Sequence, residues 1–281
     1  MSDRIIDAHH HLWQFGRFHY GWIAEGRGPL GRDYLPADLA AAAAPPGVRA
    51  TVLVQTIASF DETRWFCELA DASDLIQRVV GWVDLGGQNV GDELDELMAA
   101  SPSFAGVRVA GPALVDGGGA PRLSALSGLG ALQARGLTCD LLIGPDHLAH
   151  VPALAEAAPG LRIVIDHLAK PPIRRGGLSG WAEDLAAAGR WPNVHAKVSG
   201  LITEADRQAW TPADLQPYID HAIDCFGFER LMYGSDWPVC LQAGSYEQAL
   251  DAVRTCIGDA TTADQAKLLA QTAADFYRVE S

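Results

Sequence analysis

Three consecutive histidines end a short apolar segment near the N-terminus, in the string Asp7-Ala8-His9-His10-His11. Side chains alternate between the two faces of a β-strand, so His9 and His11 share one face and His10 points to the other. Two imidazoles with this spacing bind one metal ion or one anion, and imidazole also transfers protons near neutral pH. A run of structural, hydrogen-bonded histidines is the alternative, and we assign His10 to it. For His9 and His11 we predict a functional role.

A second group of polar residues ends the apolar run that leads into Ile165-Asp166-His167-Leu168-Ala169-Lys170. Packing does not explain why a carboxylate and an ammonium group flank the end of a buried segment. We predict His167 as a third metal ligand or as the partner of a developing oxyanion, and Lys170 as a fixed cation for the substrate. The alternatives are a capping role for Asp166 and a solvated Lys170.

A third apolar segment ends in the string Gly234-Ser235-Asp236-Trp237-Pro238. Asp236 stands where the strand must stop, because the proline two residues later cannot continue regular pairing. A carboxylate in this place is well suited to act as a general base or as a metal ligand. The alternative is that Asp236 caps a helix.

Weaker candidates lie in or near the ends of other apolar segments: Gln55, Asp84, Arg108, Asp140 and Lys197. Arg108 and Lys197 have the charge to clamp a substrate carboxylate or carbonyl, and a salt bridge at the rim of the fold is the alternative for each. We predict substrate contacts for Gln55, Arg108 and Lys197 and leave the roles of Asp84 and Asp140 open. For His195, two residues before Lys197, we expect a structural role.

Aromatic residues gather in the long segment that follows the three histidines, where Trp13, Tyr20 and Trp22 occur. Such side chains either form the wall of a sugar-like ligand site or pack the loop against itself. We predict a substrate contact for Trp22.

Eight apolar segments rich in Val, Ile and Leu position these residues. They are residues 5–9, 51–55, 79–85, 106–109, 138–143, 162–167, 194–199 and 231–236. The segments between several of them have helix-forming composition, notably 62–70, 93–100, 184–188 and 246–255. Alternating strands and helices form parallel sheets, and eight such units predict a closed (β/α)8 TIM barrel with its active site at the C-terminal ends of the strands. No G-x-G-x-x-G string follows the first segment, which counts against a dinucleotide-binding fold.

We expect residues 1–281 to form this single domain, with a loop at Gly117-Gly118-Gly119 and a final helix over 262–277 packed on the barrel. The net charge of −14 argues against nucleic acid as a partner, because phosphate binding needs clustered Lys and Arg. A small anionic ligand is compatible with it. Five scattered cysteines, no apparent signal peptide and no membrane-spanning segment favour a cytoplasmic protein with free thiols. The sequence leaves the oligomeric state open.

Several strings, taken together and in this order, resemble the lactonase branch of the amidohydrolase superfamily, which includes L-fuconolactonase and 2-pyrone-4,6-dicarboxylate lactonase. They are D-A-H-H-H-L-W at 7–13, R-D-Y-L-P-A-D-L at 32–39, G-W-V-D-L at 81–85, D-L-L-I at 140–143, D-H-L-A-K-P at 166–171, K-V-S-G-L-I-T-E-A-D at 197–206 and R-L-M-Y-G-S-D-W-P-V-C at 230–240. The resemblance extends over nearly the whole chain, and the last two strings are the ones most similar to L-fuconolactonase.

The resemblance implies a catalytic centre of His9, His11, His167 and Asp236, with Arg108 and Lys170 in contact with the substrate. It implies hydrolysis of a sugar-acid lactone, a small molecule, to the open hydroxy acid with Asp236 as the general base. The site suits one divalent ion, with zinc the first choice, and related lactonases differ in whether they need a metal at all. Two departures stand out. Val109-Ala110-Gly111-Pro112 lacks the polar residues expected after Arg108, and Thr272-Ala273 replaces the usual Asn-Ala.

Two other functions remain open from the sequence. The first is a metal-dependent decarboxylase of a small aromatic or unsaturated acid, because enzymes of that kind in the same superfamily use a similar ligand set. The second is a barrel that binds sugar acids without catalysis. The complete set of four polar residues at the strand ends disfavours the second.

Overall fold

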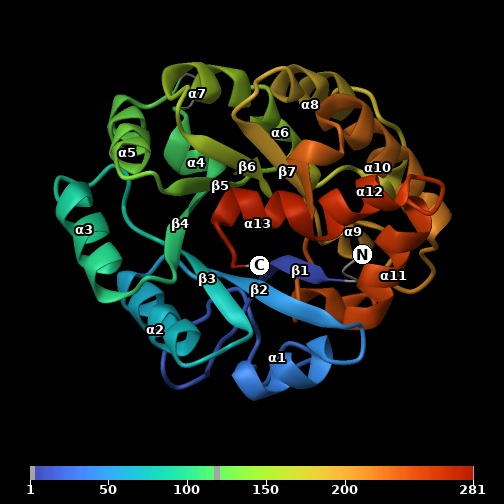
Figure 1. Ribbon diagram of the computed structural model, residues 1–281, viewed down its shortest axis with the longest axis horizontal. Helices are drawn as coiled ribbons and strands as arrows, with labels where there is room; N and C mark the ends of the chain where they lie inside the picture. The colour runs from blue at the N-terminus through green and yellow to red at the C-terminus, as the bar shows by residue number, and fades with distance from the viewer. Residues whose placement is uncertain (1–3, 117–120, 281) are drawn as a thin grey trace.

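A ring of eight parallel strands forms the centre of the computed structural model, which describes residues 4–116 and 121–280 (Figure 1). The strands pair in chain order: β1 (Ile5–His10), β2 (Val48–Val54), β3 (Ile76–Gly81), β4 (Phe104–Ala110), β5 (Thr138–Leu142), β6 (Arg162–Ile165), β7 (Val194–Val198) and β8 (Leu231–Tyr233). Two backbone hydrogen bonds close the ring between its last and first strands. The amide of His11 donates to the carbonyl of Trp237 at 2.7 Å, and that of Asp236 donates to the carbonyl of His9 at 2.8 Å. The predicted TIM barrel is confirmed.

Most helices surround the ring, and the last one lies across its end. They are α1 (Pro36–Ala43), α2 (Phe60–Asp71), α3 (Val90–Ala100), α4 (Gly111–Leu114), α5 (Leu123–Ala134), α6 (Pro145–Leu148), α7 (Val151–Ala157), α8 (Trp181–Gly189), α9 (Leu201–Glu204), α10 (Pro212–Phe226), α11 (Tyr246–Cys256), α12 (Thr262–Ala266) and α13 (Thr272–Tyr277). Ser59 begins α2 and Ser245 begins α11 by accepting a hydrogen bond from a first-turn amide, as N-cap residues do. All the predicted helices are present. The predicted loop at 117–119 lies outside the described residues.

Three strands end two or more residues earlier than predicted, at Gly81, Ile165 and Tyr233. After β3 the Thr63 hydroxyl of α2 accepts a hydrogen bond from the Trp82 amide at 2.7 Å and draws the chain out of the sheet. After β6 the residues from His167 to Lys170 all have positive φ, and after β8 Asp236 has φ 55°. The predicted catalytic residues of these two strands therefore stand on turns just above the sheet.

The terminal helix closes the N-terminal end of the barrel. Figure 1 shows α13 lying across the middle of the strand ring. Ala273, Phe276 and Tyr277 form one buried cluster with inward-facing strand residues that include Val52 and Met232. The predicted final helix is thus confirmed, with a π-helical turn at Lys267–Gln271 between α12 and α13.

Among the described residues no helix is both long enough and apolar enough to cross a membrane. All five cysteines are free thiols, and four of them are buried.

A buried carboxylate in α2 makes the stability of the fold depend on pH. Glu62 accepts hydrogen bonds from the amides of Thr56 and Ile57 at 2.8 and 3.0 Å through one oxygen, and its other oxygen has no partner in the described part of the chain. Burial raises the pKa of Glu62 from 4.5 to about 7. Its contribution to stability is therefore fully present below the unfolded-state pKa and is lost as the pH rises through the folded-state pKa.

We expect Glu62→Gln to remove this pH dependence, because the amide keeps an acceptor for both backbone donors and carries no charge. Relative to wild type, the variant should gain about 3 kcal/mol of unfolding free energy between pH 5 and pH 8.5. Urea unfolding at the two pH values measures it. Glu68→Gln, an exposed change on the same helix, is the control. Equal pH profiles for wild type and Glu62→Gln would contradict the assignment.

Candidate active site

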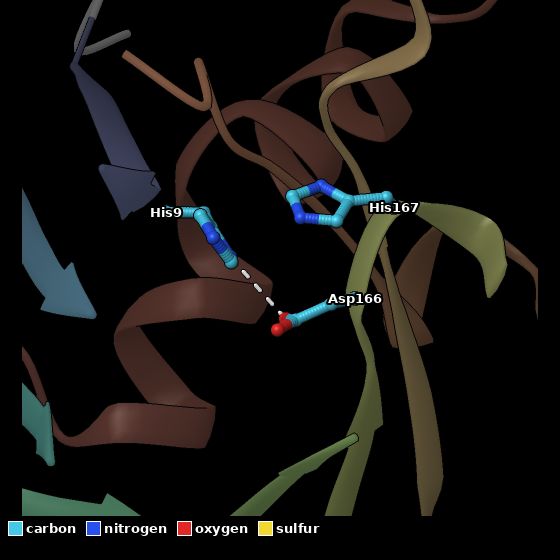
Figure 2. A group of neighbouring side chains, drawn as sticks. All are labelled: His9, Asp166 and His167. Atoms are coloured by element: carbon cyan, nitrogen blue, oxygen red, sulfur yellow. Dashed lines mark ion pairs between the residues drawn. The ribbon is translucent and has the colours of Figure 1, made fainter. Parts of the chain in front are cut away.

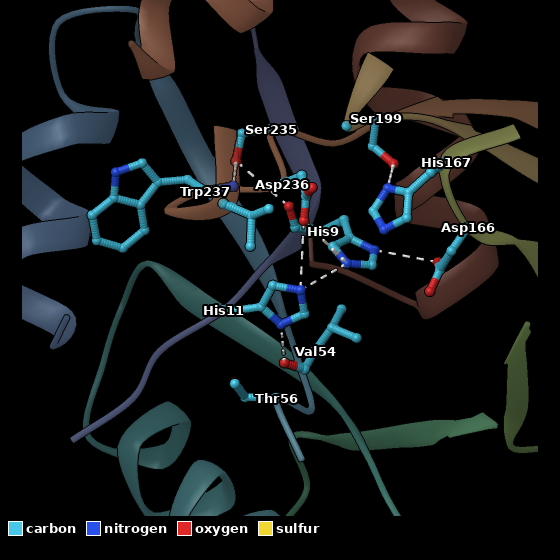
Figure 3. A network of polar contacts seen from close by, with 12 residues as sticks. His9, His11, Val54, Thr56, Asp166, His167, Ser199, Ser235, Asp236 and Trp237 are labelled. Carbon is cyan, nitrogen blue, oxygen red and sulfur yellow. Dashed lines mark hydrogen bonds and ion pairs between the residues drawn. The ribbon is translucent and has the colours of Figure 1, made fainter. Parts of the chain in front are cut away.

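Three side chains converge at the C-terminal end of the barrel: His9 and His11 from the end of β1 and Asp236 from the turn after β8 (Figure 3). The two imidazole Nε2 atoms are 3.2 Å apart. Asp236 Oδ1 lies 3.8 Å from the Nε2 of His9 and 3.5 Å from that of His11. Ligands around tetrahedral zinc at about 2.1 Å are separated by about 3.4 Å. The three atoms therefore fit one such ion.

A local irregularity of β1 turns both histidines toward this site. The pairing of β1 with β2 shifts register between Asp7 and His10. We infer that the extra residue lets Ala8 pack inside the barrel while His9 and His11 also point inward. His10 points elsewhere and contacts the Thr51 hydroxyl at 2.9 Å, which agrees with the structural role predicted for it.

The second nitrogen of each imidazole also has a partner. His11 Nδ1 is 2.8 Å from the Val54 carbonyl oxygen, an acceptor, so this nitrogen carries the proton and Nε2 is free to bind a metal. His9 Nδ1 is 3.2 Å from Asp166 Oδ1, an acceptor, and also 3.2 Å from Lys197 Nζ, a donor. Burial lowers the pKa of His11 to about 3 and that of His9 well below 6.5. Burial therefore favours the neutral form of both rings, which is the form that binds a metal.

His167 stands beside His9 on the turn after β6, as Figure 2 shows, with their ring centres 4.5 Å apart. Its Nδ1 is 2.9 Å from the Ser199 hydroxyl oxygen. Ligand atoms of His9, Asp166 and His167 lie within 4.8 Å of one another, and so do those of His9, His11 and Asp236. His9 belongs to both groups. The structure therefore brings together the four residues predicted from the sequence and adds Asp166.

Four consecutive residues with positive φ, His167 to Lys170, aim the His167 ring. None is glycine, and each such residue costs roughly 1–2 kcal/mol. Backbone strain of this kind persists where the surrounding structure imposes it, commonly at functional sites. The sequence contains no glycine that would have signalled this turn.

Below His9 lies a cluster of fully buried charges. Lys197 Nζ is 2.5 Å from Asp140 Oδ2 and 3.0 Å from Asp166 Oδ1. Burial raises the pKa of Asp140 to about 6 despite this pairing. Burial acts in the same direction on Asp166, but the charge of Lys197 and the contact with His9 outweigh it and hold the pKa of Asp166 well below 3.8. Lys197, predicted to contact the substrate, instead forms the alternative salt bridge inside the barrel.

Asp7, for which the sequence suggested no role, ties the two ligand-bearing strand ends together. Its Oδ1 accepts hydrogen bonds from the amides of Ser235 and His9 at 2.8 and 3.1 Å. Its Oδ2 accepts from the hydroxyls of Ser235 and Tyr246 at 2.5 and 2.6 Å. This carboxylate therefore fixes the backbone next to Asp236 relative to His9. Its only sequence signal was an acidic residue inside an apolar strand.

A cavity of about 550 Å³ opens above the site. Its walls include His11, His167 and Asp236 and four of the predicted substrate contacts: Trp22, Gln55, Arg108 and Lys170. Glu204 and Arg207 also line it and were not predicted. The apolar part includes Ala110 and Leu142, which pair across β4 and β5. This wall agrees with the lack of polar residues after Arg108.

Arg108 is buried, and its guanidinium donates to the Gln55 carbonyl and lies 3.8 Å from Asp166 Oδ2. The Arg108 Nε and Gln55 Oε1 atoms are buried and have no hydrogen-bond partner within residues 4–116 and 121–280. Burial raises the pKa of Asp236, although His167 and Arg108 oppose the shift. A carboxylate of raised basicity next to a cavity with cationic walls is equipped to remove a proton from water.

The two residues whose roles were left open lie outside the cavity wall, as does His195. Asp84 is exposed and accepts a hydrogen bond from the Gly86 amide. Asp140 lies within the barrel, in the charge cluster. His195 packs its ring on Phe276, with 4.8 Å between the ring centres. This contact agrees with the structural role expected for His195.

Gly200 leaves room for His167 and Asp236 to face each other. A Cβ atom at this position would lie 2.8 Å from His167 Nδ1 and 3.0 Å from Asp236 Oδ2, and Gly200 has φ +66°. We expect Gly200→Ala to displace both side chains and to lower kcat/KM for the lactone hydrolysis expected from the sequence about 10²-fold. Gly47→Ala is the matched control, since it has φ +81° with nothing within 4 Å of its added carbon. Equal activity losses in both variants would refute the steric explanation.

Comparison with known proteins agrees with this geometry. The sequence profile of the amidohydrolase family matches residues 6–279. An L-fucono-1,5-lactonase of Burkholderia ambifaria is 35% identical over 98% of this chain and 96% of its own length. One from Burkholderia multivorans is 34% identical over 97% and 95%. A crystal structure of an amidohydrolase from Burkholderia multivorans with bound zinc superposes with a TM-score of 0.89 at 32% identity, covering 98% of this chain and 99% of that one. The chain belongs to the amidohydrolase family.

Proposed function

We propose that this protein hydrolyses the lactone of a sugar acid to the open hydroxy acid. The observation that carries the proposal is Asp236, a buried carboxylate of raised pKa that borders a cavity of about 550 Å³ beside neutral histidines. The full-length similarity to two L-fucono-1,5-lactonases supports the choice of substrate class.

In this proposal Asp236 takes a proton from the water that attacks the ring carbonyl, and it returns the proton to the leaving ring oxygen. The attack forms one carbon–oxygen bond and ring opening breaks another, so the product is a carboxylic acid with a free hydroxyl. Arg108 and Lys170 orient the substrate by donating to its oxygens. Gln55 and Trp22, both in the cavity wall, complete the substrate contacts.

We propose that His9, His11 and Asp236, with His167 beside them, hold one divalent ion, zinc being the first choice. When bound, such an ion polarises the carbonyl and lowers the pKa of bound water. Without it, the proton transfer by Asp236 and the contacts of His167 and Arg108 with the developing oxyanion remain available. Whether turnover needs the ion is therefore a separate measurement.

The test is acid release from a panel of aldono- and aldarolactones in weakly buffered indicator, with and without a chelator. Hydrolysis of one of the sugar lactones is the expected result, and the chelator arm decides whether a metal is required. Release of CO2 from a small aromatic or unsaturated acid, with no lactone hydrolysed, would replace the proposal by a decarboxylase. Saturable binding of a sugar acid with no product from either panel would indicate a barrel without catalytic activity.

A further inference from the structure

The terminal helix places a tyrosine inside the barrel. Tyr277, the last residue of α13, is 1% exposed and packs in the cluster that closes the N-terminal end. Its neighbours in that cluster are apolar, among them Ile6, Val164 and Phe276. This apolar cluster, which plugs the N-terminal end of the barrel, needs no hydroxyl group. A buried hydroxyl without a partner would destabilise the fold. The partner of the Tyr277 hydroxyl therefore indicates what else the residue does.

That partner is the carboxylate at the base of the charge cluster. The hydroxyl of Tyr277 donates to Asp140 Oδ2 at 2.6 Å. Lys197 donates to the same oxygen at 2.5 Å, and its ammonium nitrogen lies 5.4 Å from the centre of the Tyr277 ring. The other oxygen, Asp140 Oδ1, is buried without a partner among the described residues. Tyr277 and Lys197 are thus the two donors that orient the carboxylate through Oδ2.

Lys197 carries the effect of this contact to the active site. Its ammonium nitrogen lies 3.0 Å from Asp166 Oδ1 and 3.2 Å from His9 Nδ1, and those two atoms are 3.2 Å apart. The contacts with Asp166 and Lys197 favour opposite proton positions on the His9 ring. If Nδ1 donates to Asp166, Nε2 keeps a free electron pair for a metal ion; if Nδ1 accepts from Lys197, the proton sits on Nε2 and blocks it. The direction in which the Lys197 N–H groups point therefore selects the form of His9.

We propose that Tyr277 is a positioning residue for the active site, acting through Asp140 and Lys197 on Asp166 and His9. Its hydroxyl holds Asp140 against Lys197, so the ammonium group stays directed at the Asp140 and Asp166 carboxylates and leaves His9 Nδ1 to donate to Asp166. Tyr277 touches neither the cavity nor the proposed substrate. The inference rests on the proposed function only for its zinc-affinity measurement, because zinc binding at this site is part of that proposal.

The test is Tyr277→Phe, which removes one oxygen and keeps the ring in the plug. With 15N-histidine labelling, the metal-free variant should show His9 ring-nitrogen signals shifted toward the Nε2-protonated form relative to wild type. Zinc affinity, measured by competition with a chromophoric chelator, should fall about 10–100-fold. In an Asp140→Asn background, Tyr277→Phe should lower zinc affinity no further, because the two residues act in series.

Two other tyrosines provide controls. Tyr233 is fully buried and its hydroxyl has no partner among the described residues, and Tyr218 is buried and donates to the Gly177 carbonyl on the outside of the barrel. Neither phenylalanine variant should alter the His9 signals.

If Tyr277→Phe leaves these signals and zinc affinity within the range of the two controls, the terminal helix only seals the barrel. If wild type does not bind zinc, the His9 signals alone show whether Tyr277 positions the active site. A failure to hydrolyse lactones would affect the proposed function and leave both readouts intact.

Discussion

Asp236→Asn is expected to lower kcat for lactone hydrolysis about 10²–10⁴-fold, the usual contribution of a positioned general acid–base group. Asparagine has nearly the same shape but accepts no proton at neutral pH, so the water loses its base and the leaving oxygen loses its acid. The measurement is initial-rate kinetics on the lactone found in the panel, with KM determined separately from kcat.

The same variant should fold at least as stably as wild type. Burial raises the pKa of Asp236, which means that the folded protein is destabilised by keeping this group ionised at neutral pH. Loss of activity together with unchanged or higher thermal stability would mark a group retained for function. The control is Asp84→Asn, because Asp84 is exposed and outside the cavity wall. Full turnover by Asp236→Asn would remove the assignment of the general base.

The site residues at the strand ends could be predicted from the sequence because the geometry of a parallel barrel determines their place. In a parallel barrel all strands end at the same edge, so polar residues at the ends of apolar segments come together. From the sequence alone, that rule predicts His9, His11, His167 and Asp236 near one another. Arg108 and Lys170 follow the same logic, and both line the cavity.

The buried residues that hold these side chains in place could not be predicted, because their contacts join residues remote in sequence. Asp7 and Ser235 lie 228 positions apart, and Asp140 and Tyr277 lie 137 apart. Pairing them requires the strand register and the place of the terminal helix, and no periodic pattern contains either. The sequence also does not show how far from the strand end a side chain lies, and this distance decides whether it reaches the cavity. Lys197 lies one residue before the end of β7, which puts its ammonium group under the site and out of the cavity wall.

The charge cluster provides the second large expected effect: Lys197→Met should lower the free energy of unfolding by about 3–5 kcal/mol. Methionine fills much of the same volume, but Asp140 and Asp166 then lose their shared cation in a site from which water is excluded. Removing one partner of a buried ion pair leaves an uncompensated charge, and that penalty exceeds the net contribution of the intact pair. Urea unfolding at neutral pH measures the loss.

Lys267→Met is the matched control, because Lys267 also pairs with two carboxylates, Glu229 at 2.6 Å and Asp264 at 2.8 Å, but at the surface. Exposed pairs contribute about 0–1 kcal/mol, so this variant should remain close to wild type. Adding Asp140→Asn to Lys197→Met should restore part of the lost stability, since only Asp166, which still has Arg108 at 3.8 Å, then lacks the charge of Lys197. Equal small losses for both lysines would mean that water reaches the cluster, and the fixed position of Lys197 beneath His9 would lose its physical basis.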